Sequence, residues 1–342
     1  MMRAAVYYNN RDIRVEEMPV PKISSCELLV KVMACGICGS DVMEWYRIGR
    51  APLVLGHEIT GVIEKVGEEV KNYRKGDRVF VSHHVPCNTC YYCLKGSYTV
   101  CDTLRKTTIE PGGFAEYIRI PEINVQYGVY TLPPELSFEA GTLIEPLACV
   151  VRGQRKAHLK LGQSVLVIGS GISGLLHIQL AHASGASSIM ATDINDFRLS
   201  SAEQFGADYT VRANENISER LRQVNNGRLA DVVIVCTSAV EALKQAFQTV
   251  DRNGIILVFA PAEPDITIPL HLYDVFFNGI TITASYGASP LDIATAIELL
   301  RSRRIEATKM ITHRLPLAET GLGFELVSKA QNSIKVIIEL HR

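Results

Sequence analysis

Four cysteines lie in one short segment at spacings that suit a metal ion: Cys87, Cys90, Cys93 and Cys101. Four thiolates spaced in this way can converge on one tetrahedral zinc ion, with Zn–S distances of about 2.3 Å. Because all four positions would be filled by protein, we predict a structural zinc rather than a catalytic one. Two local disulfides or four buried thiols are the alternative, which is disfavoured in a chain with no sign of secretion.

A second set of candidate metal ligands is dispersed along the chain and comprises Cys38, His57, Glu58 and Glu145. A thiolate, an imidazole and carboxylates make a mixed site that can leave one position open for substrate, as catalytic zinc requires. The spacing of these four residues does not by itself distinguish a metal site from residues with no shared function. A buried cysteine, a core histidine and two surface acids fit the same sequence.

The segment Ser164–Asp193 reads as strand, glycine-rich turn, helix and second strand, with G-x-G-x-x-G at the turn. The first glycine permits the tight turn, the second lets the backbone approach a pyrophosphate, and the third lets the helix pack on the strand. The helix N-terminus then offers unpaired N–H groups to the phosphates. The predicted pyrophosphate contacts are Gly169, Gly171, Ile172, Ser173 and Gly174.

Asp193 closes the second strand of this unit. A carboxylate there can accept hydrogen bonds from both ribose hydroxyls and would repel a 2′-phosphate, so the sequence favours NAD over NADP. Arg198 complicates the prediction, because a nearby arginine can accommodate that phosphate.

The elements that must position these residues change character along the chain. Up to residue 146, short β-rich runs between turn signals predict a barrel-like domain. The predicted strands are Ala4–Tyr8, Ile13–Val15, Glu27–Met33, Gly61–Val66 and Asp77–Ser82.

From about Val150, strands alternate with helices, and six strands suit a doubly wound parallel sheet. Ligands of such sheets bind at the carboxyl ends of the strands, which makes Thr237, Ala260 and Ser285 candidate cofactor contacts. After Pro290 we predict one helix, Leu291–Arg301, and a final strand, Lys335–Leu340, which return to the first domain.

Composition limits the classes of protein that fit. The chain has 342 residues, enough for two domains, with 47% hydrophobic residues and a net charge of −1. This balance gives no electrostatic case for nucleic acid or an anionic membrane as partner. The N-terminus lacks the apolar core of a signal peptide and no segment resembles a membrane span, so we predict a cytoplasmic protein.

The motifs occur together in one order that resembles the zinc-dependent medium-chain dehydrogenase/reductase family. They are Cys38-Gly-Ser40-Asp41, Gly56-His57-Glu58, the four-cysteine cluster, Gly112-Gly-Phe-Ala-Glu-Tyr117, Glu145-Pro146 and G-x-G-x-x-G. The resemblance covers essentially the whole chain. It implies an α/β protein of two domains: a GroES-like β-barrel catalytic domain (1–149 and 288–342) and a Rossmann NAD-binding domain (150–287).

The resemblance implies that Cys38 and His57 are ligands of a catalytic zinc and that Glu58 or Glu145 completes the set, directly or through water. The resemblance thus implies two zinc ions per chain. Ser40 matches a hydroxyl that relays the proton of the alcohol, but Met43 stands where many relatives carry the next relay histidine. Lys335 resembles a basic residue that reaches the pyrophosphate, with an ordinary surface lysine as the alternative.

Glu145-Pro146 resembles the sorbitol (polyol) and threonine dehydrogenase branches. The implied activity is oxidation of a secondary alcohol (a polyol, sugar alcohol or cyclitol) by NAD at a zinc site. The alternatives are an L-threonine 3-dehydrogenase and, in another class, a catalytically silent NAD-binding protein.

The resemblance also implies a homodimer or homotetramer, with the sixth strand at the subunit interface. His83 and His84 are predicted to form a polar loop in preference to a second metal site.

Overall fold

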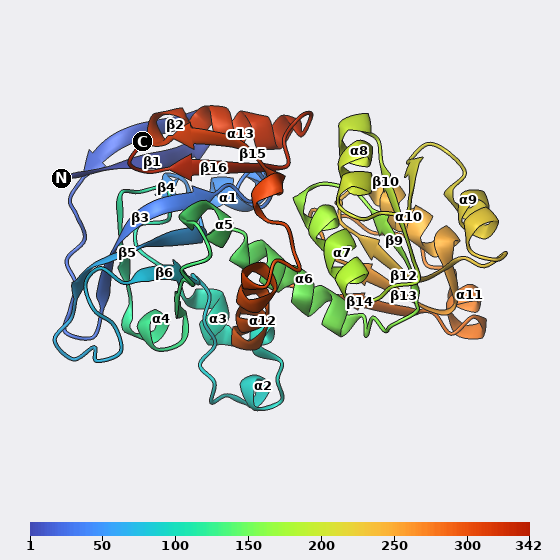
Figure 1. Ribbon diagram of the computed structural model, residues 1–342, viewed down its shortest axis with the longest axis horizontal. Coiled ribbons are helices and arrows are strands. Elements are labelled where there is room, and N and C mark those ends of the chain that lie inside the picture. Colours follow the sequence, from blue (N-terminus) through green and yellow to red (C-terminus); the bar gives the residue numbers. More distant parts are fainter. The chain divides into compact units, whose positions relative to one another are not determined.

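The computed structural model describes residues 1–342 and divides into two compact units (Figure 1). Unit 1 comprises Met1–Ala148, Ala288–Ser302 and Ala307–Arg342, and unit 2 comprises Cys149–Gly287 and Arg303–Glu306. The predicted boundaries placed Cys149 and Arg303–Glu306 in the first domain, whereas here both group with unit 2. Cys149 lies within the helix that leads from one unit into the other, where sequence patterns mark no break.

Unit 1 is built on two β-sheets. The larger has the order β15-β16-β3-β5-β6-β8, and β7 also pairs with β3. Its strands are β3 (Leu28–Gly36), β5 (Glu58–Val66), β6 (Arg78–Val81), β7 (Tyr117–Ile120), β8 (Val129–Thr131), β15 (Ile311–Pro316) and β16 (Lys335–Glu339). The smaller sheet contains β2 (Asp12–Met18), β1 (Met2–Asn9) and β4 (Leu53–Val54). The β-rich first domain is therefore confirmed.

The alternating apolar residues of these strands form the core of unit 1. Val30, Ile59, Ile63 and Val336 are fully buried there. Gly61 permits the close approach of β5 to β3, because a Cβ at this position would overlap the carbonyl oxygen of Lys31. This close pairing holds the ends of β3 and β5 together, where the candidate ligands lie.

The helices of unit 1 are mostly short. They are α1 (Glu44–Arg47), α2 (Tyr91–Leu94), α3 (Asp102–Lys106), α4 (Glu122–Tyr127), α5 (Phe138–Gly141), α12 (Pro290–Arg301) and α13 (Thr320–Lys329). The prediction of one helix and one strand after Pro290 was incomplete, since β15 and α13 also occur there. Glycines at 321 and 323 lower the helix propensity of α13. In the fold, Gly323 lets this helix pack closely on Ile37.

Unit 2 contains a six-stranded, all-parallel sheet of order β11-β10-β9-β12-β13-β14. The strands are β9 (Ser164–Ile168), β10 (Ser188–Asp193), β11 (Tyr209–Arg212), β12 (Ala230–Val235), β13 (Val250–Val258) and β14 (Thr281–Ala284). Successive strands run outward on either side of β9, which confirms the doubly wound Rossmann sheet.

Four crossover helices pack against the strands of this sheet (Figure 1): α7 (Ile172–Ala183), α8 (Asp196–Gln204), α9 (Ile217–Val224) and α10 (Val240–Thr249). Helix α6 (Ile144–Lys156), which begins in unit 1, precedes the first strand of the sheet, and α11 (Leu272–Phe277) comes between β13 and β14 in the chain. None of the helices in the structure is both long enough and apolar enough to cross a membrane.

Candidate metal and cofactor sites

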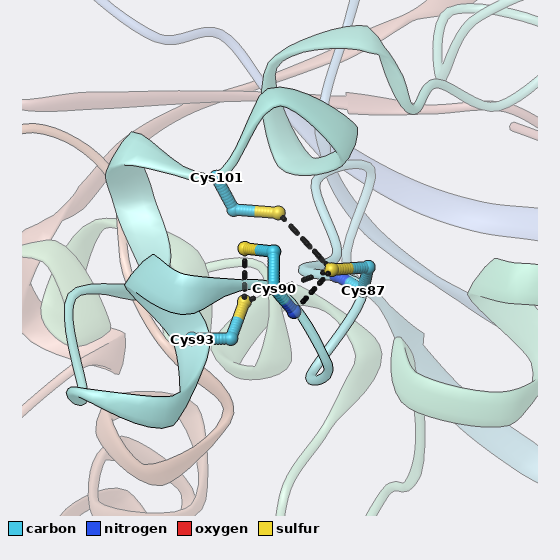
Figure 2. Close-up of side chains that lie close together, drawn as sticks. All are labelled: Cys87, Cys90, Cys93 and Cys101. Atoms are coloured by element: carbon cyan, nitrogen blue, oxygen red, sulfur yellow. Dashed lines mark hydrogen bonds between the residues drawn. The ribbon is translucent and has the colours of Figure 1, made fainter.

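Figure 2 shows the four cysteines of the predicted structural site with their side chains turned toward one another. The Sγ–Sγ distances are 3.6 Å for Cys90–Cys93, 3.7 Å for Cys87–Cys101 and 4.0 Å for Cys87–Cys93. Ligands of a tetrahedral zinc with Zn–S bonds of about 2.3 Å lie about 3.8 Å apart, so the cluster has the size of such a site. The nine cysteines are all free, which makes the disulfide alternative wrong in this structure.

Local hydrogen bonds to the Cys87 sulfur favour its deprotonated form, which is the form that binds a metal cation. The backbone N–H and the hydroxyl of Thr89, and then the N–H of Cys90, lower the pKa of the Cys87 thiol to about 5. Since the thiolate is the form that binds metal, the segment stabilises the charge that zinc requires. Cys90 lies at the N-terminal end of α2 and Cys101 at that of α3, so two short helices fix the spacing.

The second site forms where β3 and β5 end side by side. The register pairs Gly36 with Glu58, so Cys38, just beyond β3, comes close to His57 and Glu58. The candidate ligand atoms of these three residues all lie within 4.8 Å of one another. Residues 20 apart in sequence thus form the mixed thiolate, imidazole and carboxylate set that suits a catalytic zinc. These donors fit the metal that the sequence implied.

A buried lysine accompanies this site. Lys335 forms an ion pair with Glu58, and its Nζ also donates to the carbonyl of Ile37 at 3.0 Å. Both side chains are at most 1% exposed, so the surface-lysine alternative is wrong. The predicted contact of Lys335 with the pyrophosphate is not supported either, because its Nζ is held by Glu58 and Ile37. Burial acts to lower the pKa of Lys335, but the Glu58 carboxylate outweighs it and the pKa is raised. Gly36 leaves room for the pair, since a Cβ there would overlap the Glu58 carboxylate.

Glu145 lies in the first turn of α6. Its charge also raises the pKa of Lys335, so this carboxylate lies near the same site. It does not belong to the compact set formed by Cys38, His57 and Glu58.

Asp41, to which the sequence assigned no role, orients the histidine ligand. Its Oδ1 lies 3.3 Å from Nδ1 of His57, and its Oδ2 accepts the N–H of Cys38 at 3.0 Å. Burial acts to lower the pKa of His57, but the negative charges of Asp41 and Cys38 outweigh it and raise the pKa well above its usual value. A carboxylate on one imidazole nitrogen fixes the ring and makes the other nitrogen a better ligand.

We expect Asp41→Asn to weaken metal binding at this site by about 10- to 100-fold while the fold is retained. The variant keeps the size of the side chain and removes the charge that faces His57. Competition with a chromogenic chelator measures the affinity, and Asp12→Asn is the matched control, since Asp12 is a half-buried acid of the same unit that pairs with Arg14. Metal affinity equal to that of the unmodified protein would show that Asp41 does not position His57.

His83 and His84 lie in a loop, as predicted, but next to the candidate metal site rather than in a solvated segment. The ring of His83 lies 4.8 Å from that of His57 and 3.9 Å from that of His84. Burial lowers the pKa of His83 well below its usual value and that of His84 to about 4. Both rings are therefore neutral near pH 7 and form part of the wall beside His57.

In unit 2, the glycine-rich turn has the predicted shape. Gly169 adopts φ +93°, and a Cβ at Gly174 would overlap the carbonyl oxygen of Gly169. Ile172, Ser173 and Gly174 form the first turn of α7, whose free N–H groups suit a phosphate. The turn therefore fits a dinucleotide pyrophosphate.

Asp193 and Arg198, which were predicted to lie near the adenosine ribose, are found beside the glycine-rich turn. Asp193 accepts the N–H groups of Ser170 and Asn195 at 2.8 and 3.0 Å, which hold its carboxylate beside the turn. Nη1 of Arg198 lies 4.0 Å from Asp193 Oδ2, and its guanidinium packs over Gly171. Thus the acid that favours NAD and the arginine that complicates the prediction lie together.

The three remaining cofactor candidates follow β12, β13 and β14 at their carboxyl ends. Thr237 lies against Gly169, and Ala260 and Ser285 hydrogen-bond through their N–H groups to β12 and β13, respectively. The Oγ atom of Ser285 is buried without a hydrogen-bond partner. A ligand at this edge of the sheet would satisfy it, as the topology predicts.

Comparisons with known proteins agree with both units. Residues 24–134 match the alcohol dehydrogenase GroES-like domain, and residues 173–302 match the zinc-binding dehydrogenase domain. The chain is 32% identical to sorbitol dehydrogenase of Bacillus subtilis (strain 168), over 100% of this chain and 98% of that protein. It is 32% identical to L-threonine 3-dehydrogenase of Bacillus velezensis, over 95% of this chain and 94% of that protein. The chain therefore belongs to the zinc-dependent medium-chain dehydrogenase/reductase family.

Solved structures extend the similarity to the complete fold. The alcohol dehydrogenase of Thermus sp. ATN1 superposes with a TM-score of 0.87 at 32% identity, covering 99% of both chains. Galactitol-1-phosphate dehydrogenase of Escherichia coli gives 0.87 at 28% identity, covering 99% of this chain and 100% of that one. A zinc-binding dehydrogenase of Sinorhizobium meliloti bound to NADP gives 0.88 at 28% identity, covering 99% of both.

Proposed function

We propose that this enzyme oxidises a secondary alcohol of a polyol, sugar alcohol or cyclitol with NAD as hydride acceptor. The observation that carries the proposal is the convergence of Cys38, His57 and Glu58 within 4.8 Å, in the unit that matches the GroES-like domain. The similarity to sorbitol dehydrogenases supports the substrate class. The similarity to L-threonine 3-dehydrogenases supports threonine as the second candidate.

Each part of the chain has a defined task in this reaction. Zinc, held by Cys38 and His57 with Glu58 or Glu145, would supply a Lewis acid that polarises the substrate oxygen, and NAD would accept the hydride. Asp41 orients His57, and Lys335 balances the charge of Glu58. Ser40, next to Cys38, places a hydroxyl at the same site. The four-cysteine cluster would hold a second, structural zinc.

Reduction of NAD by a panel of polyols, cyclitols, threonine and simple alcohols tests this proposal, before and after chelation. We expect turnover with a polyol or cyclitol that chelation abolishes and zinc restores. Turnover with threonine alone would replace the proposed substrate with the second candidate. NAD binding without turnover, together with one zinc per chain, would instead support a catalytically silent NAD-binding protein.

We also propose NAD as the preferred cofactor, because both oxygens of Asp193 are held beside the glycine-rich turn. Asp193→Asn keeps the size of the side chain but removes the charge that repels a 2′-phosphate, while Arg198 stays in place. We expect the ratio of kcat/KM for NADP to that for NAD to rise by about 10- to 100-fold. Asp196→Asn, an exposed acid of α8, is the control. An unchanged ratio would contradict the proposed role of Asp193.

The edge of the unit 2 sheet supports a homodimer or homotetramer as the assembly. Strand β14 pairs only with β13, so its outer edge offers unpaired backbone N–H and C=O groups. Apolar side chains near it are well exposed: Leu272 (71%), Phe276 (78%), Phe277 (67%) and Ile282 (42%). We propose that a second copy of the chain covers this edge across a two-fold axis.

We expect Ile282→Lys to convert the assembly to a smaller species, because the lysine would place a charge inside the buried interface. Light scattering after size-exclusion chromatography measures the mass. Ile194→Lys is the matched control, since Ile194 is 81% exposed and lies at the end of β10. A mass unaffected by Ile282→Lys would place the interface elsewhere.

The nine free thiols support a reducing, cytoplasmic location.

A further inference from the structure

The segment Glu44–Arg50 places two arginines around one aromatic ring. It consists of helix α1 and, directly after it, the 3-10 helix η1 (Ile48–Arg50). The Cζ atom of Arg47 lies 4.7 Å from the ring centre of Tyr46, and the Cζ atom of Arg50 lies 5.8 Å from the same centre. At these distances a guanidinium is attracted to an aromatic ring. Two positive charges are therefore held close together on this segment.

Arg47 connects this pair of charges to the candidate metal site. Its Nη2 donates to Ser40 Oγ at 3.0 Å and lies 3.4 Å from Oδ1 of Asp41, the carboxylate that faces His57. The side chain of Arg47 is only 13% exposed, and that of Asp41 is fully buried. Asp41 therefore balances the charge of Arg47, whose guanidinium is occupied by contacts within the protein.

Arg50, by contrast, is exposed and forms no ion pair with the chain. Glu44 is the only acid of the segment, and its Oε1 accepts the N–H of Asn10, in the turn between β1 and β2, at 3.4 Å. The charge of Arg50 is thus left without a carboxylate partner. Such a guanidinium offers a planar set of N–H donors that matches two oxygens of a phosphate or a carboxylate.

The charge of Arg50 also acts on the histidines beside the metal site. The ring of His84 lies 3.9 Å from that of His83, which lies 4.8 Å from that of His57. Burial is the first cause of the low pKa of His84. The positive charges of His57, Arg47 and Arg50 lower this pKa further, so Arg50 lies within electrostatic range of the wall beside His57.

We propose that Arg50 binds an anionic group of the substrate, which is a polyol that carries a phosphate or a carboxylate away from its reacting hydroxyl. This inference rests on the proposed dehydrogenase function and narrows its substrate class. The reacting hydroxyl lies at the site formed by Cys38 and His57, and the anionic group pairs with the guanidinium beside Tyr46. A neutral polyol lacks the charge that this guanidinium attracts.

Three compounds with the same six-carbon chain test the proposal: sorbitol, sorbitol 6-phosphate and gluconate. We expect kcat/KM with NAD to be about 10- to 100-fold higher for the phosphate ester, for gluconate or for both than for sorbitol, the range of one charge-assisted hydrogen bond. The larger of the two gains identifies the anionic group. Arg50→Gln should remove this preference by raising KM at nearly constant kcat, because the contact is the same in ground state and transition state. Equal kcat/KM for all three compounds, or equal losses for all three in Arg50→Gln, would overturn the proposal.

Arg74→Gln is the matched control. Arg74 is 89% exposed and precedes β6, whereas His83 follows the other end of that strand. This variant should leave all three kcat/KM values unchanged. Arg50→Lys, which keeps the charge but not the planar donors, should retain part of the preference, and added salt should reduce it because exposed charges are screened. A preference that neither salt nor Arg50→Gln reduces would show that the anionic group binds elsewhere.

Binding measured without turnover separates this proposal from the proposed reaction. Trp45 is the only tryptophan of the chain, and its ring centre lies 5.7 Å from that of Tyr46. A ligand at Arg50 should therefore change the tryptophan fluorescence. In the zinc-loaded protein without NAD, we expect a saturable change with sorbitol 6-phosphate or gluconate, with a Kd about 10- to 100-fold higher in Arg50→Gln.

The outcomes of the fluorescence titration decide on Arg50 alone. An equal Kd in the unmodified protein and in Arg50→Gln would overturn the proposal even if alcohols are oxidised. Competition between NAD and the anionic compound would show that Arg50 binds the cofactor, which would also overturn it. Absence of turnover with every alcohol would instead overturn the proposed function and leave the titration to decide on Arg50.

Discussion

Replacing Cys38 with serine is expected to lower turnover by at least about a thousandfold, because zinc held at the proposed site would supply several kcal/mol of charge stabilisation in the transition state. The metal content should fall from two ions per chain to one, since the four-cysteine cluster is separate from the Cys38, His57 and Glu58 set. Elemental analysis of the purified variant and steady-state assays with NAD measure the two effects.

Cys26→Ser is the control for this experiment. Cys26 belongs to the same unit, lies outside both clusters, and its thiol donates to Glu69 at 3.3 Å. The control should keep both metal ions and full turnover. A Cys38→Ser variant that does the same would show that the site does not use this thiolate, and the proposed reaction would lose its structural basis.

The second large effect concerns the four-cysteine cluster. Cys93 is buried, and we expect Cys93→Ala to release one metal ion, because three remaining thiolates hold zinc less tightly than four. A loss of about 3–5 kcal/mol should lower Tm by about 10 °C, at about 2–4 °C per kcal/mol for domains of this size. Calorimetry measures Tm, and limited proteolysis should show cleavage that begins within residues 87–106.

Tyr91→Ala serves as the control for the cluster, because Tyr91 lies on α2 between two of the cysteines and is 68% exposed. It should keep the metal ion and the Tm of the unmodified protein. If Cys93→Ala retained both its metal and its resistance to protease, the cluster would not be a zinc site. Since the cluster lies apart from Cys38 and His57, its loss should affect stability before it affects turnover.

The sequence predicted best those features that depend on residues near one another in the chain. The spacing of the four cysteines and the strand–turn–helix around Gly169 are local, so the fold had little freedom to change them. The strands that the sequence predicted also followed their apolar patterns, with shifts of a few residues at their ends, whereas β4, β7, β8 and β15 were not predicted. By contrast, α13 contains two glycines, which lower helix propensity, and in the fold its Gly323 packs closely against Ile37.

The features that the sequence did not predict depend on register between distant strands. The pairing of β16 with β3 brings Lys335 to Glu58, and no local pattern specifies that contact. The hydrogen bond that Arg47 Nη2 donates to Ser40 Oγ likewise depends on how the chain runs from the Cys38 loop into α1. The Cys38-Gly-Ser-Asp motif did contain Asp41, but only its distance from His57 shows what the carboxylate does.

The position of β16 in the chain affects the order in which the two metal sites can be completed during synthesis. Figure 1 shows this strand, in red, within the sheet of blue and cyan strands that emerge first, and it pairs there with β3. All of unit 2 is encoded between them, and domains fold as units while the chain grows. All four cysteines of the cluster have been synthesised by residue 101. The ion pair of Glu58, by contrast, cannot form until Lys335 has been synthesised. The proposed structural site can therefore be completed early in synthesis, while the proposed catalytic site gains Lys335, the partner of Glu58, only after all of unit 2 has been made.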